Sequence, residues 1–273
     1  MKHWLGTVAL LVIGGGGVCR APAQTADEFV AQGRDIPQER NPSMALAYFD
    51  SALSLDRENY EANWRAAQAM VDIGKQWPDD QKNPRRDSLY AFAESLAKKA
   101  VQVNPDGADG HYALALSLGR TSLTKSNKER VKYAKEIRAE VLRALELNPQ
   151  HDRAEHILGR WHAEIRRLSG FTRFFAKTFL GAGIFNEASW QQAIEHLNRA
   201  VELSPQTIYH HLDLAEIYID VGQYSNAREH LDEVGRLPDF DYMDPRYKDR
   251  ALELLKKIEG KKDKGSDESP GPE

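Results

Sequence analysis

The chain has 273 residues, of which 29% are charged, and its formal net charge is -4. This length is enough for one sizeable core or for two compact domains. The mildly acidic balance gives no reason to expect nucleic acid as a partner, because a phosphate-binding surface is basic. Aromatic residues make up 9% of the chain, which excludes a disordered composition.

The first 23 residues have the pattern of a secretory signal peptide. Lys2 and His3 form a basic start, an apolar run covers residues 4–18, and an Ala-Pro-Ala site ends at Ala23. The run is short for a membrane span. We therefore expect cleavage after Ala23 and export to the periplasm or the medium, with lipid attachment at Cys19 as the alternative. Cys19 is the only cysteine, so a cleaved chain has no disulfide.

A helix–turn–helix repeat of about 34 residues is clearest from Ile208 to Asp241. Ala215 and Ala227 allow its two helices to approach closely, and Gly222 separates them. The second-helix pattern of this repeat, which ends in a turn residue that is usually proline, occurs four times upstream. Its positions are Ala45, Phe49, Ala52 and Arg57; Ala93, Ala97, Ala100 and Pro105; Ile137, Val141, Ala144 and Pro149; and Ala193, Leu197, Ala200 and Pro205.

These units predict an all-α array of tetratricopeptide-like repeats, an α-solenoid, over residues 24–259. The intervals between units exceed one repeat length, so the array contains insertions, the longest between Pro149 and Pro205. A last helix from Asp244 to Ile258 is expected to cap the array through Tyr247, Leu252, Leu255 and Ile258. The polar tail over 260–273 is expected to be disordered.

Local signals agree with these boundaries. Asn41-Pro42 and Asp244-Pro245 have the pattern of a cap followed by proline in the first turn. Two capping boxes are expected, from Ser126 to Glu129 and from Ser189 to Gln192. Residues 75–86 contain two prolines and predict a loop.

The first helices of such arrays line a concave groove, and the repeat phase predicts which side chains face it. Arginines dominate in the earlier units and carboxylates in the last, which suits a peptide or a partner helix. The alternative is a solvated face on which some charges pair across repeats. The predicted groove residues are Trp64, Arg65, Asp72, Tyr112, Arg120, His156, Arg160, Glu164, Tyr209, Asp213, Glu216 and Asp220.

The sequence gives little support for an enzyme or a metal protein. His151, His156 and His162 lack the i, i+4 spacing of two ligands on one helix face, and His210 and His211 point in different directions. The chain also has no GxSxG sequence and no glycine-rich phosphate loop after a strand. We expect a non-enzymatic chain without a cofactor.

Two segments each leave two interpretations open. The basic run from Lys125 to Arg138 suits phosphate or acidic lipid, or it is the wet face of a helix that buries Val131, Ala134 and Ile137. An insertion carries four phenylalanines at helical spacing, which either pack inward or dock on a membrane or partner. These phenylalanines are Phe171, Phe174, Phe175 and Phe179.

The sequence Leu-Gly-Arg-Trp at Leu158–Trp161, followed by Glu164, Leu168-Ser169 and Leu180-Gly181, resembles the regulator of microtubule dynamics protein family. The segments 193–197 and 200–205 are similar to that family's next repeat. The resemblance implies an all-helical tetratricopeptide-like fold and an adaptor role, and some eukaryotic members associate with microtubules or organelle membranes. With the signal peptide, it predicts an exported prokaryotic relative.

Three functions follow from these patterns. The first is an adaptor that binds a protein or peptide in its groove. The second is a protein that docks on a membrane surface through the phenylalanine insertion, with peripheral membrane contact only. The third is the microtubule-associated role that the family resemblance implies.

Overall fold

The structure is a computed structural model that describes residues 24–79, 81–168 and 183–264. Within these residues the chain forms eleven α-helices and one 3-10 helix and contains no strand, which confirms the predicted all-α class. The helices are α1 (Ala26–Asp35), α2 (Pro42–Leu55), α3 (Tyr60–Gly74), α4 (Pro84–Val103), α5 (Ala108–Ser122), α6 (Asn127–Leu147), α7 (Asp152–Arg167), η1 (Gly183–Glu187), α9 (Trp190–Leu203), α10 (Ile208–Val221), α11 (Tyr224–Arg236) and α12 (Asp244–Lys257).

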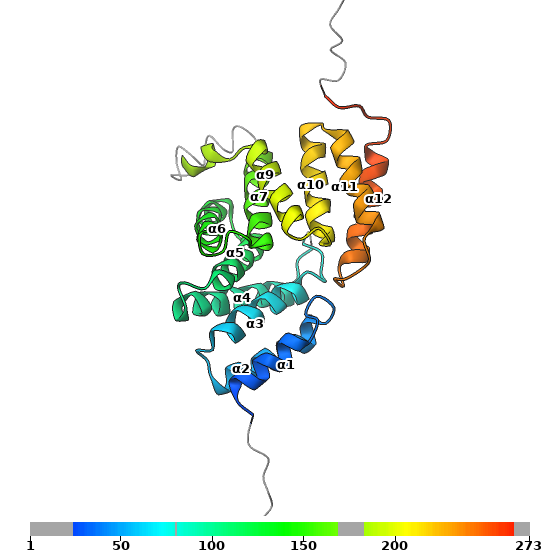
Figure 1. Ribbon diagram of the computed structural model, residues 1–273. Helices are drawn as coiled ribbons and strands as arrows, with labels where there is room; N and C mark the ends of the chain where they lie inside the picture. Colours follow the sequence, from blue (N-terminus) through cyan, green and yellow to red (C-terminus); the bar gives the residue numbers. More distant parts are fainter. Residues whose placement is uncertain (1–23, 80, 169–182, 265–273) are drawn as a thin grey trace, which may run out of the picture.

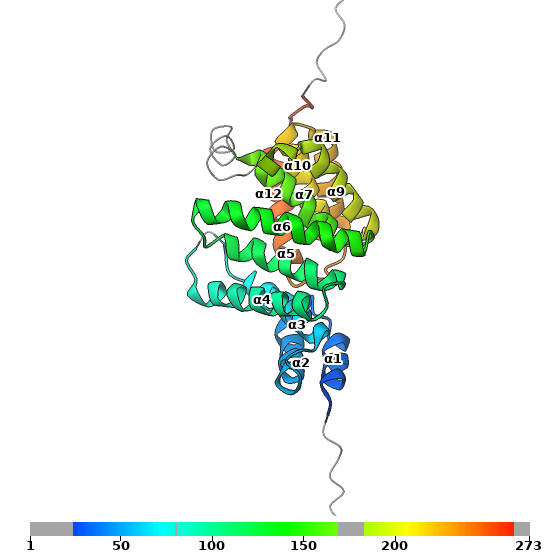
Figure 2. The same ribbon diagram turned by 90° about the vertical axis from the view of Figure 1, so that its left-hand side faces the viewer.

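The helices pack in consecutive pairs, as expected for a repeat array. The pairs are α1 with α2, α3 with α4, α5 with α6, α7 with α9, and α10 with α11 (Figure 1). The first helices also contact one another across the repeats, α3 with α5, α5 with α7 and α7 with α10. Figure 2 shows α4, α5 and α6 stacked in successive layers. The first helices therefore form one continuous layer of the array.

The second-helix pattern marks the core. Eleven of its twelve upstream apolar positions are buried, and Ile137 is half-buried at the edge. Alanine dominates these positions, so paired helices approach closely and the larger Phe49, Val141 and Leu197 fill the remaining space.

A repeated hydrogen bond holds three of the four turns against the helix that follows. Asn63 Nδ2 donates to the Arg57 carbonyl at 3.0 Å. His111 Nε2 lies 2.9 Å from the Pro105 carbonyl, and His211 Nε2 lies 3.0 Å from the Pro205 carbonyl. All three donors lie six residues after the turn residue, so the repeat reuses one position to satisfy a carbonyl that the helix leaves unpaired.

The helix caps follow the local signals with two exceptions, at Ser189 and at Asp244. Asn41 caps α2, and Ser126 forms a reciprocal capping box with Glu129. Ser189 caps α9 by accepting from the Gln192 amide at 3.0 Å, but the predicted capping box is not formed, because the Gln192 side chain donates to Glu195 instead. Gly222 ends α10 with φ of 80°, a left-handed conformation that favours glycine.

Asp244 is the second exception, because it is the first residue of α12 rather than its cap, which is Met243. Its carboxylate instead accepts from the Phe240 and Asp241 amides at 2.8 and 2.7 Å. The side chain thus stabilises the preceding loop.

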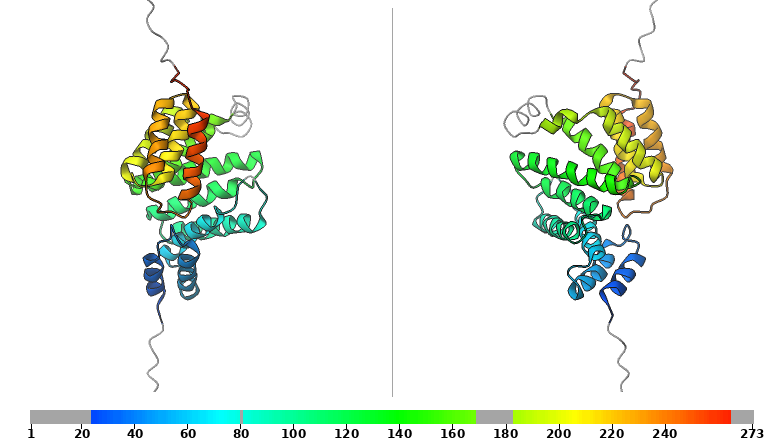
Figure 3. Two further views of the ribbon diagram at one scale, coloured as in Figure 1. Left: turned by 90° about the vertical axis from the view of Figure 1, so that its right-hand side faces the viewer. Right: turned by 60° about the vertical axis from the view of Figure 1, so that its left-hand side comes forward.

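The capping helix α12 lies along α10 and α11 (Figure 3). Its buried face consists of Ala251, Leu254 and Ile258, with Tyr247 and Leu255 half-buried. The inclusion of Leu252 was wrong, since that side chain is 58% exposed. Leu252 lies beside the stripe formed by Ala251, Leu254 and Ile258 and is not part of it.

The first five residues of the predicted tail, 260–264, belong to the described part of the chain and contact the last repeat. The Lys264 amide donates to the Gly222 carbonyl at 3.0 Å, and Asp263 accepts from the Ser225 amide at 2.8 Å. The rest of the predicted tail, 265–273, lies outside the described residues.

The loop after α1 meets the loop before α12, although they are about 200 residues apart in the chain (Figure 1). Arg40 donates to the carbonyls of Asp239 and Phe240 at 3.3 and 3.2 Å. The Tyr242 amide donates to the Glu39 carbonyl at 2.9 Å. These polar contacts join the two ends of the array.

Two predicted segments lie outside the described residues: the signal peptide over 1–23 and the four phenylalanines Phe171, Phe174, Phe175 and Phe179. Among the helices that are described, none combines the length and apolar character needed to cross a membrane.

Candidate functional site

The Leu158–Trp161 motif lies on α7, and each of its residues has a distinct structural role. Leu158 is buried, and Gly159 lets α7 lie directly on α9, because a Cβ there would come within 2.8 Å of Leu197 Cγ. Trp161 is buried and its Nε1 donates to the Ala134 carbonyl at 2.8 Å. Arg160 is the member of the motif that faces the next repeat.

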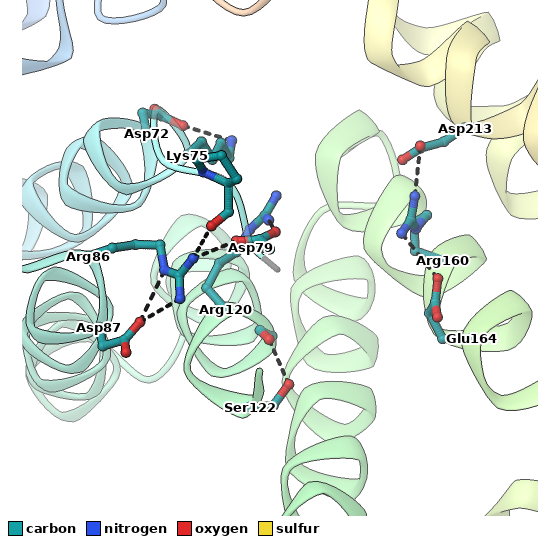
Figure 4. Close-up of polar contacts among 12 residues, drawn as sticks. Asp72, Lys75, Asp79, Arg86, Asp87, Arg120, Ser122, Arg160, Glu164 and Asp213 are labelled. Carbon is teal, nitrogen blue, oxygen red and sulfur yellow. Dashed lines mark hydrogen bonds and ion pairs between the residues drawn. The ribbon is translucent and has the colours of Figure 1, made fainter. Parts of the chain in front are cut away.

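Arg160 joins α7 to α10 through a carboxylate that it shares with a histidine. Its Nη1 lies 2.7 Å from Asp213 Oδ1, and the other oxygen of Asp213 lies 3.0 Å from His156 Nε2. Figure 4 shows Arg160 between Asp213 and Glu164. Burial alone would raise the pKa of Asp213, but the charge of Arg160 and the hydrogen bond from His156 outweigh it and lower that pKa.

A chain of hydrogen bonds extends from Asp213 through two histidines. His156 Nδ1 lies 2.9 Å from His210 Nδ1, and His210 Nε2 lies 3.1 Å from Asp152 Oδ2. Burial lowers the pKa of His210 to about 4. The chain of contacts links side chains of α7 with side chains of α10.

The remaining charges of the last units are also paired. Arg167 lies 2.6 Å from Glu164 and 2.7 Å from Asp220. Glu216 pairs with Arg250 of α12 at 3.1 Å. Tyr209 packs edge-on against His156, and burial raises its pKa well above the usual value. His156 and Arg160 of α7 thus pair with Asp213 of α10 across the repeats, whereas Asp220 and Glu216 pair with Arg167 and Arg250, which the repeat phase did not predict. We call the predicted groove residues of α7 and α10, with these partners, the C-terminal network.

The first units differ, because a cavity of about 380 Å³ opens beside α3 and α5. Three predicted groove residues line it, Trp64, Arg65 and Tyr112, and the repeat phase thus places them on one surface. Gln68 of α3 and Asp109 of α5 also line it. The other lining residues come from the end of α1, the loop after it and the start of α7: Gly33, Arg34, Ile36, Pro37, Gln38, Glu39, His151, Asp152 and Arg153.

The cavity carries polar groups that the described part of the chain leaves without a hydrogen bond. His151 caps α7, where its Nδ1 accepts from the Ala154 amide at 3.3 Å. Its Nε2 therefore carries the proton of the neutral ring, yet it has no hydrogen-bond partner, and Asp109 Oδ1 lies 3.6 Å away. The buried Gln68 amide is also without a bond within the described residues.

The arginines around the cavity share few carboxylates. Arg34 and Arg65 both lie near Glu61 Oε1, at 3.2 and 2.7 Å. The guanidinium of Arg65 also lies over the Trp64 ring, 4.3 Å from its centroid. Two positive groups therefore face one carboxylate at this side of the cavity.

Asp72 and Arg120, the other predicted groove residues, face loops (Figure 4). Asp72 pairs with Lys75 at 2.8 Å and accepts from Gln38 Nε2 at 3.1 Å. Arg120 pairs with Asp79 at 2.9 Å.

Sequence reasoning missed Glu39 and Arg153, whose side chains pair at 3.0 Å beside the cavity. Arg153 lies among Tyr112, Tyr209 and Asp72, whose negative or polar oxygens raise its pKa although burial opposes the rise. The repeat phase assigns α7 residues from His156 onward to the groove, and Glu39 lies in a loop that no periodicity covers.

The basic run on α6 behaves as the outer face of a packed helix. Val131, Ala134 and Ile137 pack against the cluster of Trp161, Ile165 and Phe185. Lys132 pairs with Glu136, and Arg138 pairs with Glu187 and lies over the Trp161 ring. This packing favours the interpretation that the basic run is the solvent-exposed face of a helix.

The described residues contain no group of three or more histidine, cysteine or acidic side chains that could hold a metal ion. The adjacent histidines diverge, His210 toward His156 and His211 toward His230 at 3.0 Å. Each pair joins two helices, so these histidines stabilise the packing of the array.

The comparisons with known proteins agree with this architecture. The sequence model for "Regulator of microtubule dynamics protein 1-3" matches residues 23–259. Regulator of microtubule dynamics protein 3 of Rattus norvegicus is 24% identical over 203 residues, which cover 72% of this chain and 41% of the relative. Regulator of microtubule dynamics protein 1 of Bos taurus is 23% identical over 150 residues, or 55% of this chain and 46% of the relative. The chain spans less than half the length of these relatives.

Among solved structures, a thermophilic tetratricopeptide protein of Thermus thermophilus matches with a TM-score of 0.59 and 18% identity. The match covers 85% of this chain and 99% of that protein, and it shows the tetratricopeptide fold. Both the predicted fold and the family resemblance are thus confirmed. A family model that matches nearly the whole array leads to one conclusion: this chain belongs to the regulator of microtubule dynamics protein family.

Proposed function

We propose that the chain is a non-enzymatic adaptor that binds a segment of a protein partner in the cavity beside α3 and α5. The single observation that carries this proposal is the cavity itself, which offers Trp64, Tyr112 and the unbonded Gln68 amide on one surface. Tetratricopeptide arrays commonly use this layer of helices for protein recognition. The family and the fold are of the scaffold and regulator type.

The lining of the cavity suits a polypeptide. Aromatic faces accept apolar side chains, and amide and imidazole donors accept main-chain carbonyls or carboxylates. The C-terminal network is a poor second site, because Arg160 and Arg167 of α7 pair with carboxylates of the next repeat, Asp213 and Asp220 of α10. A ligand there would have to break ion pairs that hold α7 to α10.

Affinity capture from host extract tests the proposal. The variant Gln68→Glu keeps the side-chain shape and adds a negative charge to the cavity, while Gln102→Glu makes the same change on the exposed face of α4. We expect Gln68→Glu to lose the partner by roughly tenfold and Gln102→Glu to retain it. Equal capture by both variants would place the partner site elsewhere.

Where the adaptor acts, outside the cytoplasm or on microtubules, is a separate proposal. The basic start, apolar run and Ala-Pro-Ala sequence before residue 24 support an exported protein. The names of the relatives support a microtubule partner instead. Sequencing the N-terminus of the protein purified from its host decides the first proposal, which requires a start at Gln24. Co-sedimentation with polymerised tubulin decides the second.

A further inference from the structure

The loop after α1 places a carboxylate at the wall of the cavity. The Pro37 carbonyl accepts from the amides of Arg40 and Asn41, both at 2.9 Å, and this turn presents Glu39. The Glu39 side chain pairs with Arg153 at 3.0 Å.

The loop is held mainly by polar contacts. Gln38 donates to Asp72, Glu39 pairs with Arg153, and Arg40 donates to the carbonyls of Asp239 and Phe240. The apolar contribution comes from Ile36, which packs beside Phe49 and Ala66. Each polar contact can be replaced by an equivalent group of a ligand, whereas a buried apolar loop could not leave without exposing its core.

Arg153 has one direct ion pair within the described residues, with Glu39. It lies between the buried Tyr112 and the half-buried Tyr209 on the inner layer. Asp152, its neighbour, is bound to His210 at 3.1 Å, and Asp72 to Lys75 at 2.8 Å. Glu39 is thus the carboxylate that pairs directly with Arg153, and it comes from a loop outside the repeats.

We propose that Arg153 anchors a carboxylate of the partner peptide, and that Glu39 occupies this position in the free chain until an acidic residue of the partner replaces it. This inference rests on the proposed adaptor function and adds the partner's chemistry, an acidic peptide segment. The cavity beside Glu39 supplies the room in which that segment lies.

An internal ligand lowers the apparent affinity for an external one, because only the fraction of molecules with a free site can bind. Replacing Glu39 by glutamine removes the charge of the internal ligand and keeps its shape. The Glu39→Gln variant should therefore bind an external carboxylate roughly tenfold more tightly than the wild type does.

Fluorescence anisotropy with the full chain tests this inference. The probe is a labelled, C-terminally amidated peptide copying residues 35–42, and the second probe has glutamine in place of the residue copied from Glu39. We expect Glu39→Gln to bind the acidic probe roughly tenfold more tightly than the wild type does, and the glutamine probe to gain nothing. The matched control Glu202→Gln changes an exposed carboxylate on α9 and should bind like the wild type.

Substitutions of Arg153 test the other half of the proposed contact. Arg153→Gln in the Glu39→Gln background should lose the gain, and Arg153→Lys should keep part of it; circular dichroism checks that each variant is folded. Equal binding of the acidic probe to wild type and Glu39→Gln, or no binding to either, would overturn the inference. Neither result affects the adaptor proposal, which fails only if the Gln68→Glu and Gln102→Glu variants capture the same partners.

Discussion

The inner layer of first helices is used in two ways along one chain. Beside α3 and α5 it borders a cavity, and Gln68 and His151 carry groups with no hydrogen bond in the described residues. On α7 and α10 the same layer is occupied by the C-terminal network, in which Arg160 and Asp213 pair at 2.7 Å. Equivalent positions of a repeat thus line a cavity in one region and attach neighbouring repeats to each other in the other.

This difference shows that charge on the groove side of a repeat does not by itself identify a binding surface. A charged side chain that has an opposite charge within reach of the next repeat stabilises the array. A side chain that lacks such a partner, or whose partner lies in a loop outside the repeats as Glu39 does for Arg153, is the one that we propose to be available to a ligand. The two regions can therefore be separated by mutations that affect stability in one and binding in the other.

The largest effect is expected at Gly159, where α7 packs on α9. A Cβ would come within 2.8 Å of Leu197 and 3.0 Å of the Ala193 carbonyl, so Gly159→Val should destabilise the fold by about 3 kcal/mol. Chemical denaturation measures this change. Gly119→Ala is the control, since no atom lies within 4 Å of its added Cβ, and it should stabilise α5 by up to about 1 kcal/mol. Similar losses from both substitutions would contradict the close packing.

The next prediction compares the loss of stability from one substitution in the C-terminal network with that from one beside the cavity. Asp213→Asn leaves Arg160 and His156 without their carboxylate and should cost about 2 kcal/mol at pH 7. Because the folded-state pKa of Asp213 is lowered, its contribution is present above the usual value of 3.8 and is lost as the pH falls below it. Gln68→Ala, on the cavity side, should change stability much less. The comparison fails if the two variants unfold at the same denaturant concentration.

The third prediction concerns His162, which lies between α7 and α9 and makes the stability of the fold depend on pH. His162 is buried, and its Nδ1 accepts from the Ser189 amide at 3.4 Å, which requires a neutral ring. Burial, then His196 and Arg138, lower its pKa to about 4. Between pH 4 and its usual 6.5 the unfolded state binds more protons, so stability should rise with pH across this window.

His162 should account for about 2 kcal/mol of that rise. His162→Asn keeps an acceptor for the Ser189 amide and removes the titrating group. Unfolding free energies measured at pH 4, 5, 6 and 7 should therefore rise less steeply in the variant. An unchanged slope would mean that other groups carry the dependence.

The smallest effect is expected at Arg40, which joins the two ends of the array. Its bonds to the Asp239 and Phe240 carbonyls are exposed, so Arg40→Ala should cost less than about 1 kcal/mol. The loop over residues 36–41 should nevertheless be cut faster by a protease, because the contact restrains it. A cleavage rate equal to that of the wild type would show that the loop is held by its other contacts.

Much of the fold can be predicted from the sequence because its signals are local. The alanines of the second-helix pattern become the closest helix contacts, and Gly222 and Ser126 mark helix ends through their own backbone or side chain. Asp244 and Leu252 show the limit of such signals. The first stabilises a loop, and the second falls outside a buried face that packing against α10 and α11 selects.

The site can be predicted only in part. The repeat phase brings Trp64, Arg65 and Tyr112 to one surface, but it cannot show that Arg160 and Asp213 contact each other, because that depends on the distance between α7 and α10. Glu39 and Arg153 are separated by 114 residues and belong to different kinds of segment. No periodicity relates them, so their pairing emerges only when the array curves back on its first loop.

Site-specific photo-crosslinking in the host tests the division of the inner layer most directly. A photo-reactive phenylalanine replaces Gln68 beside the cavity in one variant and Glu216 of the C-terminal network in the other. The account predicts a crosslinked partner from position 68 and none from position 216. A crosslink from position 216 alone, or of equal yield from both, would contradict it.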